Sequence, residues 1–158
     1  MPAAPKKIYW NDAGDQVIVA TREAFYILRF DRSSVDAALA GNTEGVDEED
    51  GSIEAAFELE AEVNEVVRSG QWVGDCFLYT NRANRLNYSV GGEVLTLSHL
   101  DEKMYVLGFL PREDRVYLCN KTLDVFSYSL LTSVLNYQTA ILRKVFDEAN
   151  ELLPAIPE

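Results

Sequence analysis

The sequence predicts a mainly β chain that ends in short α-helices. Three observations lead to this fold class: the composition, a hairpin unit that occurs three times, and a change of hydrophobic period near residue 130. The 158 residues include 8 Tyr, 7 Phe and 2 Trp, and aromatic residues favour half-buried strands. A chain of this length can bury a core of its own.

The hairpin unit has one template in all three copies. An Asp precedes an apolar strand, Thr or Asn follows six positions after the Asp, Arg or Lys comes at the seventh, and a second strand follows a short turn. Polar residues after an apolar run favour a turn, and two strands joined by a short turn form a β-hairpin. The three copies contain Asp15, Thr21 and Arg22; Asp75, Asn81 and Arg82; and Asp114, Asn120 and Lys121.

The spacing of the copies predicts their architecture. The second and third copies begin 39 residues apart, at Asp75 and Asp114, close to the roughly 40–45 residues of a four-stranded propeller blade. The first and second begin 60 apart, and the excess coincides with an acidic stretch. We therefore predict a partial WD40-type β-propeller of about three blades over residues 1–130, with an acidic insertion at about 36–62.

Other elements follow from local patterns. Residues 93–100 are expected to form an outer strand, and the apolar residues 104–110 an inner strand buried on both faces. A short helix is expected to start near Ser52, with Ile53 and Phe57 on one face.

The C-terminal part of the chain has a helical pattern. Residues 130–146 have apolar positions at a period of 3.6, with Gln138 as the one polar exception. A second short helix is expected over 147–153. We therefore expect 131–158 to begin an α-helical region.

The net charge of −12 is concentrated in one segment. Between Asp36 and Glu65 there are eleven acidic residues and no basic one. This balance argues against nucleic acid as a partner and against direct adhesion to an anionic membrane. The segment is either a solvated surface insertion or a docking strip for a basic partner.

The residues that carry chemistry are few and scattered. His99 is the only histidine, and Cys76 and Cys119 lie 43 positions apart in apolar runs, which makes no zinc or redox motif. His99 is expected to be a structural residue at a strand end and the cysteines to be reduced and buried. We predict no catalytic, cofactor or metal site and no enzymatic activity, and the binding residues are unknown.

Five tyrosines recur at strand positions and allow two interpretations. They either pack between blades with their hydroxyl groups at the rim, or they form a peptide-binding face. They are Tyr79, Tyr88, Tyr105, Tyr117 and Tyr128.

Targeting signals are not apparent. No apolar run approaches the 18 or so residues of a transmembrane helix, and the first residues lack the apolar region of a signal peptide. A cytoplasmic location is therefore expected.

Several strings together resemble one family, the coatomer beta-prime subunits. The similarity covers nearly the whole chain, and the strings are unlike generic propeller repeats. They are GQWVGDCFLYT at 70–80, NRLNY at 84–88, VGGE at 90–93, HLD at 99–101, MYVLG at 104–108, SYSLL at 127–131 and NYQTA at 136–140.

The resemblance implies a structural subunit of the COPI vesicle coat. Proteins of this family carry two WD-repeat propellers followed by an α-solenoid, and this sequence is similar to the later blades of the second propeller, with the solenoid starting within 131–158. The implied role is in Golgi-to-ER and intra-Golgi transport, peripheral on Golgi membranes and COPI-coated vesicles. Dilysine cargo tails are recognised by the first propeller in this family, so no cargo-binding residue is carried over.

The partners implied are the other coatomer subunits, notably the alpha subunit, and a small GTPase that contacts the assembled coat. The alternative function is a propeller peptide-binding module that is not tied to a vesicle coat. Because about three blades cannot close a propeller, self-association through open sheet edges is also expected.

Overall fold

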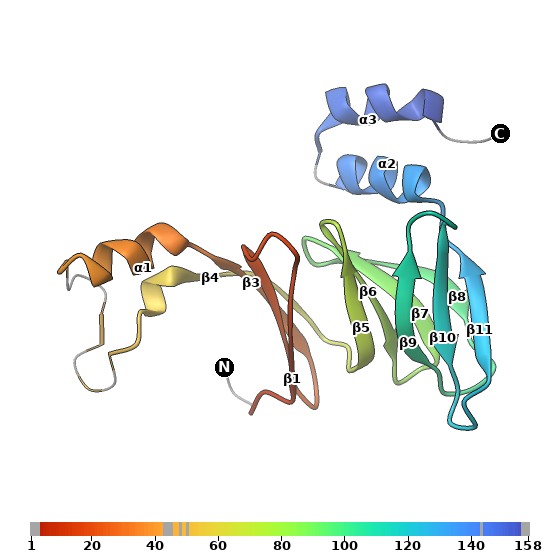
Figure 1. Ribbon diagram of the computed structural model, residues 1–158, viewed down its shortest axis with the longest axis horizontal. Coiled ribbons are helices and arrows are strands. Elements are labelled where there is room, and N and C mark those ends of the chain that lie inside the picture. The colour runs from red at the N-terminus through yellow and green to blue at the C-terminus, as the bar shows by residue number, and fades with distance from the viewer. Residues whose placement is uncertain (1–3, 43–45, 48, 50, 143, 156–158) are drawn as a thin grey trace.

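The computed structural model describes residues 4–42, 46–47, 49, 51–142 and 144–155 and confirms a mainly β chain with short C-terminal helices (Figure 1). The described strands are β1 (Lys7–Trp10), β2 (Gln16–Ala20), β3 (Phe25–Phe30), β4 (Phe57–Val63), β5 (Val67–Val73), β6 (Cys76–Asn81), β7 (Arg85–Val90), β8 (Glu93–His99), β9 (Tyr105–Leu110), β10 (Arg115–Cys119) and β11 (Val125–Ser129). The helices are α1 (Arg32–Leu39), α2 (Thr132–Leu142) and α3 (Phe146–Leu152), with 3-10 turns at Glu54–Ala56 and Leu153–Ala155.

The strands form three antiparallel sheets, each in chain order. The first sheet is β1-β2-β3-β4, the second β5-β6-β7-β8, and the third β9-β10-β11. The three predicted hairpins are confirmed as β2–β3, β6–β7 and β10–β11, the second and third strands of each sheet. Strand β5 contacts both β1 and β9, so the first strands are neighbours, as they are in consecutive propeller blades.

Strand β4 corrects the interpretation of the acidic stretch. The predicted helix with Ile53 and Phe57 on one face is wrong, because Glu54–Ala56 is a single 3-10 turn and Phe57 begins β4. Phe57–Val63 alternates apolar and acidic residues, which is the period of a half-buried strand. It pairs with β3 and completes the first sheet, so residues 57–62 belong to the sheet and not to the insertion.

The segment between β3 and β4 contains a helix that the sequence pattern did not reveal. Helix α1 begins after Asp31, whose carboxylate accepts the backbone N–H of Ser33 at 2.9 Å and so caps the helix. Helix α1 lies at one end of the molecule, away from the second and third sheets (Figure 1). The rest of the predicted insertion includes residues 43–45, 48 and 50, which lie outside the described residues.

Strand β9 is not buried on both faces as expected. Phe109 is buried, but Leu107 and Leu110 are 56% and 47% exposed. One face of the third sheet packs against the second sheet, and the other face is open to solvent. By contrast, the expected outer strand is confirmed, since β8 is the last strand of the second sheet.

Two apolar cores join the sheets. The first lies between the first two sheets and is rich in aromatic rings, with Phe77 at its centre, 5.2–6.0 Å from the rings of Tyr9, Phe25, Trp72 and Tyr79. The second lies between the second and third sheets. The second core contains Leu78, Leu86, Tyr88, Val90, Leu100, Met104, Phe109, Val116, Leu118, Leu130 and Leu135 among its buried residues.

Hydrogen bonds join the sheets as well. The indole N–H of Trp72 donates to the carbonyl of Tyr9 at 2.9 Å, linking the second sheet to the first. The hydroxyl of Thr80 donates to the carbonyl of Met104 at 2.9 Å, and the hydroxyl of Ser69 accepts the N–H of Val106 at 2.7 Å. Ser69, Trp72, Thr80 and Met104 are buried, whereas Tyr9 and Val106 are half-buried. These hydrogen bonds fix the second sheet to both of its neighbours.

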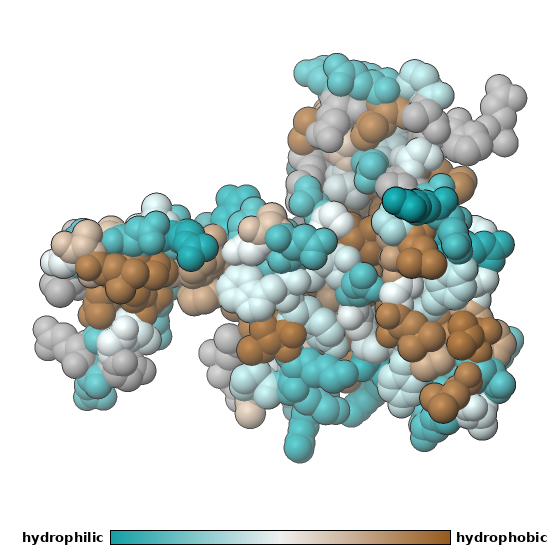
Figure 2. Space-filling view, viewed as in Figure 1, coloured by the Kyte–Doolittle hydropathy of each residue, from teal (hydrophilic) through white to brown (hydrophobic). Residues whose placement is uncertain are grey.

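The two outer sheet faces expose apolar side chains. The open face of the first sheet includes Ile8, Trp10, Phe57 and Leu59, and that of the third includes Leu107, Leu110 and Val125. Figure 2 shows apolar side chains gathered at both ends of the molecule. None of the helices in the described ranges is long and apolar enough to cross a bilayer.

Candidate functional site

At one end of each sheet, the start of the first strand lies beside the turn that follows the second strand. Lys7 of β1 pairs with Ala20, Val67 of β5 with Asn81, and Tyr105 of β9 with Cys119. In each sheet the first strand therefore begins where the second strand ends. Because the sheets stand side by side, these three ends lie along one edge of the molecule.

The template Thr or Asn organises each turn. The hydroxyl of Thr21 accepts the N–H groups of Glu23 and Ala24 at 3.2 and 3.1 Å. The side-chain oxygen of Asn81 accepts the N–H of Arg85 at 3.0 Å. In this way the side chain supplies the partners that the turn backbone lacks.

Asn120 makes the fullest set of these bonds. Its side-chain oxygen accepts the N–H groups of Thr122 and Asp124 at 3.0 and 2.9 Å. Asn120 is buried, as are Thr21 and Asn81. The sixth position of the repeat is therefore an inward-facing turn residue in all three sheets.

The seventh position faces the opposite way. Arg22, Arg82 and Lys121 are all exposed. Each turn therefore presents an exposed cation at the same edge.

The first strands add further cations at this edge. Lys6 and Lys7 precede and begin β1, and Lys103 lies just before β9. Arg68 occupies a β-bulge, since Val67 pairs with Asn81 and Ser69 with Thr80, and bulges re-aim side chains. The Nη1 of Arg68 donates to Oδ1 of Asn84 in the β6–β7 turn at 3.1 Å.

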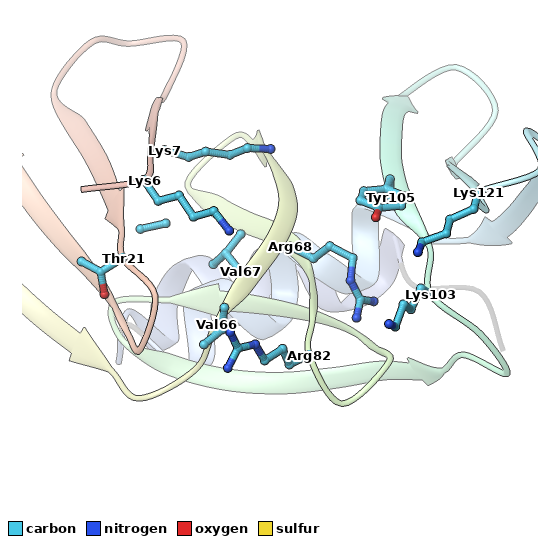
Figure 3. A pocket seen from close by; sticks show the side chains of 11 residues that line it. Lys6, Lys7, Thr21, Val66, Val67, Arg68, Arg82, Lys103, Tyr105 and Lys121 are labelled. Carbon is cyan, nitrogen blue, oxygen red and sulfur yellow. The ribbon is translucent and has the colours of Figure 1, made fainter. Parts of the chain in front are cut away.

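These cations line a groove of about 560 Å³, which we call the basic groove (Figure 3). Its side chains reach inward from all three sheets, and Arg68, Lys103 and Lys121 lie together on one side. The apolar part of the lining is formed by Ala20, Val66, Val67 and Tyr105. The cations of the basic groove are Lys6, Lys7, Arg68, Arg82, Lys103 and Lys121.

Two carboxylates close in sequence to the groove cations accept hydrogen bonds from side-chain amides. Glu65 precedes β5 and accepts the side-chain N–H of Asn81 at 2.9 Å, as well as the hydroxyl of Tyr79 at 2.9 Å. Glu102 precedes β9 and accepts the side-chain N–H of Asn120 at 2.9 Å. Across the residues that the structure describes, the ion pair formed is that of Arg29 with Glu60, at 3.2 Å, and it does not involve the groove.

The residues considered for catalysis are not brought together. His99 ends β8 and is exposed, as expected for a strand-end residue. Cys76 is buried and Cys119 half-buried, and both are free thiols. Burial, with a smaller contribution from Asp75, raises the pKa of the Cys76 thiol far above its usual range, so it carries no thiolate nucleophile. The described residues contain no cluster of His, Cys, Asp and Glu that could hold a metal ion.

The five tyrosines divide between the two interpretations. Tyr79 and Tyr88 are fully buried in the two cores, which confirms the packing interpretation for them. Tyr105 is 36% exposed and lines the basic groove, while Tyr117 and Tyr128 are half-buried. These side chains do not share one aromatic face.

Comparison with known proteins places the fold in a family. Residues 1–120 match the family model described as COPA/B second beta-propeller. The chain belongs to this family. The coatomer resemblance seen in the sequence is thereby confirmed, and so is the propeller interpretation of the repeats.

Individual relatives of the COPA/B second beta-propeller are similar at the level of sequence. Over 154 residues the chain is 51% identical to coatomer subunit beta' of Homo sapiens, covering 98% of this chain and 17% of that protein. It is 47% identical to coatomer subunit beta' of Drosophila melanogaster, covering 98% of this chain and 16% of that protein. Coatomer subunit beta'-1 of Arabidopsis thaliana is 51% identical over 153 residues, 97% of this chain and 16% of that protein. The chain thus spans about a sixth of the length of the curated relatives it matches.

Among solved structures, the WD40 domain of SCAP from fission yeast is similar with a TM-score of 0.46 and 12% sequence identity. The similarity covers 82% of this chain and 30% of that one.

The basic groove is the functional feature that sequence reasoning missed in this second-propeller chain. The signal was present, since the repeat template has a basic residue at its seventh position in every copy. The sequence alone does not show that the three turns lie at one edge of the molecule, next to Lys6, Arg68 and Lys103.

Proposed function

We propose that this chain is a segment of a COPI vesicle-coat subunit and acts there as a non-catalytic protein-interaction scaffold. The observation that carries this proposal is the 51% identity to coatomer subunit beta' over 98% of the chain. The role is in Golgi-to-ER and intra-Golgi vesicle transport, in the cytoplasm and peripheral on Golgi membranes and coated vesicles.

The architecture supports a scaffold role. Two continuous cores and a set of buried inter-sheet hydrogen bonds make the three sheets one packed unit, and rigid blades present surfaces of fixed shape. The partners proposed are the other coatomer subunits, notably the alpha subunit, and a small GTPase that contacts the assembled coat. Helices α2 and α3 are proposed to begin the α-solenoid that follows the propeller, within residues 131–158.

A chimera tests this function. The segment of human coatomer subunit beta' that matches this chain is replaced by it, and the tagged chimera is purified from cells. Since the chain has the fold and half of the residues of that segment, we expect the other coatomer subunits to co-purify as they do with the unmodified protein. A beta' subunit lacking the segment serves as the negative control. A chimera present at normal abundance that retains no other coatomer subunit would contradict the proposal.

Self-association of the isolated chain is a second proposal, favoured by the apolar outer faces of the first and third sheets. Exposed faces of this kind pair with other surfaces, and open sheet edges pair with other strands. Static light scattering of the purified chain is expected to show a mass that increases with concentration. A constant monomer mass at high concentration would rule this out while leaving the coat proposal intact.

A further inference from the structure

We propose that the basic groove binds an acidic peptide segment of a partner protein, in which carboxylates flank an apolar side chain. The proposal goes beyond the scaffold role in the coat, and its test needs no other coat component.

The charge distribution is the first support for the proposal. The chain has a net charge of −12 and only 14 basic residues, yet six of them line this one groove. Within the described part of the chain none of the six forms an ion pair. A concave surface lined by one sign of charge concentrates ligands of the opposite sign.

The groove is also preorganised. Its cations come from neighbouring sheets: Arg82 and Lys121 occupy equivalent turn positions, Arg68 lies in β5 and Lys103 lies just before β9. Arg68 is half-buried and held by Asn84. A binding group that is already held in position loses less conformational entropy when the ligand arrives.

The carboxylates that precede β5 and β9 are engaged by the turns and form no ion pair with the groove cations in the described part of the chain. Glu65 and Glu102 accept hydrogen bonds from Asn81 and Asn120, the inward-facing residues of the turns. The same asparagines that fold the turns therefore keep these carboxylates off the cations. The groove cations can therefore pair with the carboxylates of a bound ligand.

The lining favours a peptide over a phosphate compound. Val66 and Val67 lie on one side of Arg68 and Tyr105 lies on the other (Figure 3), and we call these three residues the apolar wall of the groove. A polyphosphate has no group to place against this wall, whereas an acidic peptide can bury an apolar side chain there. A basic tail, such as a dilysine peptide, would be repelled by the six cations.

Fluorescence anisotropy with the full 158-residue chain tests the proposal. The probe is a fluorescein-labelled heptapeptide, Asp-Glu-Asp-Leu-Asp-Glu-Asp. We expect saturable binding that weakens as salt is raised, because exposed charge pairs are screened. A second peptide with Ser in place of Leu is expected to bind more weakly, since it leaves the apolar wall uncovered.

Two charge-matched variants locate the site. R82E/K121E reverses two exposed groove cations, and R32E/R112E reverses two exposed arginines that do not line the groove. The groove variant is expected to bind the peptide about tenfold or more weakly and the control within about twofold. Circular dichroism verifies that each variant is folded. If the charge reversal unfolds the chain, the binding measurement is repeated with R82Q/K121Q, which only neutralises the two charges.

Three outcomes would overturn the proposal. The first is an absence of peptide binding, and the second is equal weakening in groove and control variants, which indicates an effect of net charge alone. The third is tight binding of inositol hexakisphosphate without binding of the peptide, which indicates a phosphate site. Failure of the coat chimera would affect none of these measurements.

Discussion

The hydroxyl of Tyr88 in β7 donates a hydrogen bond to Oε1 of Gln138 in helix α2. Gln138 is the polar residue that interrupts the apolar face of that helix. Tyr88 is only 1% exposed, and Leu135 of α2 lies in the same core. The helix is therefore attached to the second sheet by an apolar contact and by a hydrogen bond that explains its one polar exception.

Removing either partner of this hydrogen bond should lower stability, and the two losses should not add in the double variant. Tyr88→Phe is expected to reduce the free energy of unfolding by about 1 kcal/mol. Gln138→Leu should cost at least as much, since it leaves a buried hydroxyl without its partner. In urea denaturation the double variant is expected to lose less than the sum of the two single losses. Additive losses would show that the two side chains do not interact.

Alkaline pH should destabilise the fold through its buried tyrosines. Burial, with a smaller contribution from Cys76, raises the pKa of Tyr88 to about 12, and burial also raises the pKa of Tyr79. Between the unfolded pKa of about 10 and the folded value, the folded chain keeps a proton that the unfolded chain loses. The stabilising contribution is therefore full below pH 10 and is lost as the pH rises to about 12, by about 1.4 kcal/mol per pH unit for each group.

Urea denaturation at pH 9 and pH 11 measures this loss. Tyr88→Phe should show a smaller difference between the two pH values than the unmodified chain, because one of the titrating groups is gone. Equal differences in both proteins would contradict the assignment to Tyr88.

The sixth and seventh positions of the repeat should respond differently to mutation. Asn120→Ala removes the oxygen that holds the N–H groups of Thr122 and Asp124 and is expected to cost about 1–3 kcal/mol. Lys121→Ala, at the exposed neighbouring position, should change stability by less than about 0.5 kcal/mol. Thermal unfolding of the two variants compares them directly, and similar losses would mean that the turn does not depend on Asn120.

Gly70 allows a close approach inside the aromatic core. A methyl group at this position would lie 2.9 Å from Cε2 of Phe77 and 3.0 Å from the carbonyl oxygen of Leu78, and Phe77 is fully buried. Gly70→Ala is therefore expected to cost about 1–3 kcal/mol through overpacking.

Gly108→Ala is the matched control, because its methyl group would be 3.7 Å from its nearest neighbour, Oε1 of Gln71. Chemical denaturation should separate the two strand glycines. A Gly70→Ala variant as stable as the control would mean that the core is packed differently.

The hairpins could be predicted from the sequence because their signals are local. An apolar run, an inward-facing Asn or Thr and an exposed cation fall at fixed offsets, and the structure shows a physical role for each. Strand β4 could not be recognised in the same way, since its acidic residues marked it as part of a solvated segment. The alternation of Phe57 and Leu59 with glutamates was the relevant signal, and the pairing of β4 with β3 establishes that the segment is a strand.

The basic groove could not be predicted because it depends on long-range alignment. Arg22, Arg82 and Lys121 are separated by 60 and 39 residues in sequence, and only the side-by-side packing of the sheets places Arg82 and Lys121 in one groove. Arg68 joins them through a bulge, a feature that its sequence neighbours do not indicate.

Cryo-electron microscopy of the chimeric coatomer subunit beta' tests the central claim most directly. We predict that the three sheets occupy consecutive blades of the second propeller, with β1, β5 and β9 nearest its axis. The apolar faces around Trp10 and Val125 should then be covered by the neighbouring blades. Three sheets that do not surround a common axis, or outer faces that stay open to solvent within the folded subunit, would contradict the claim.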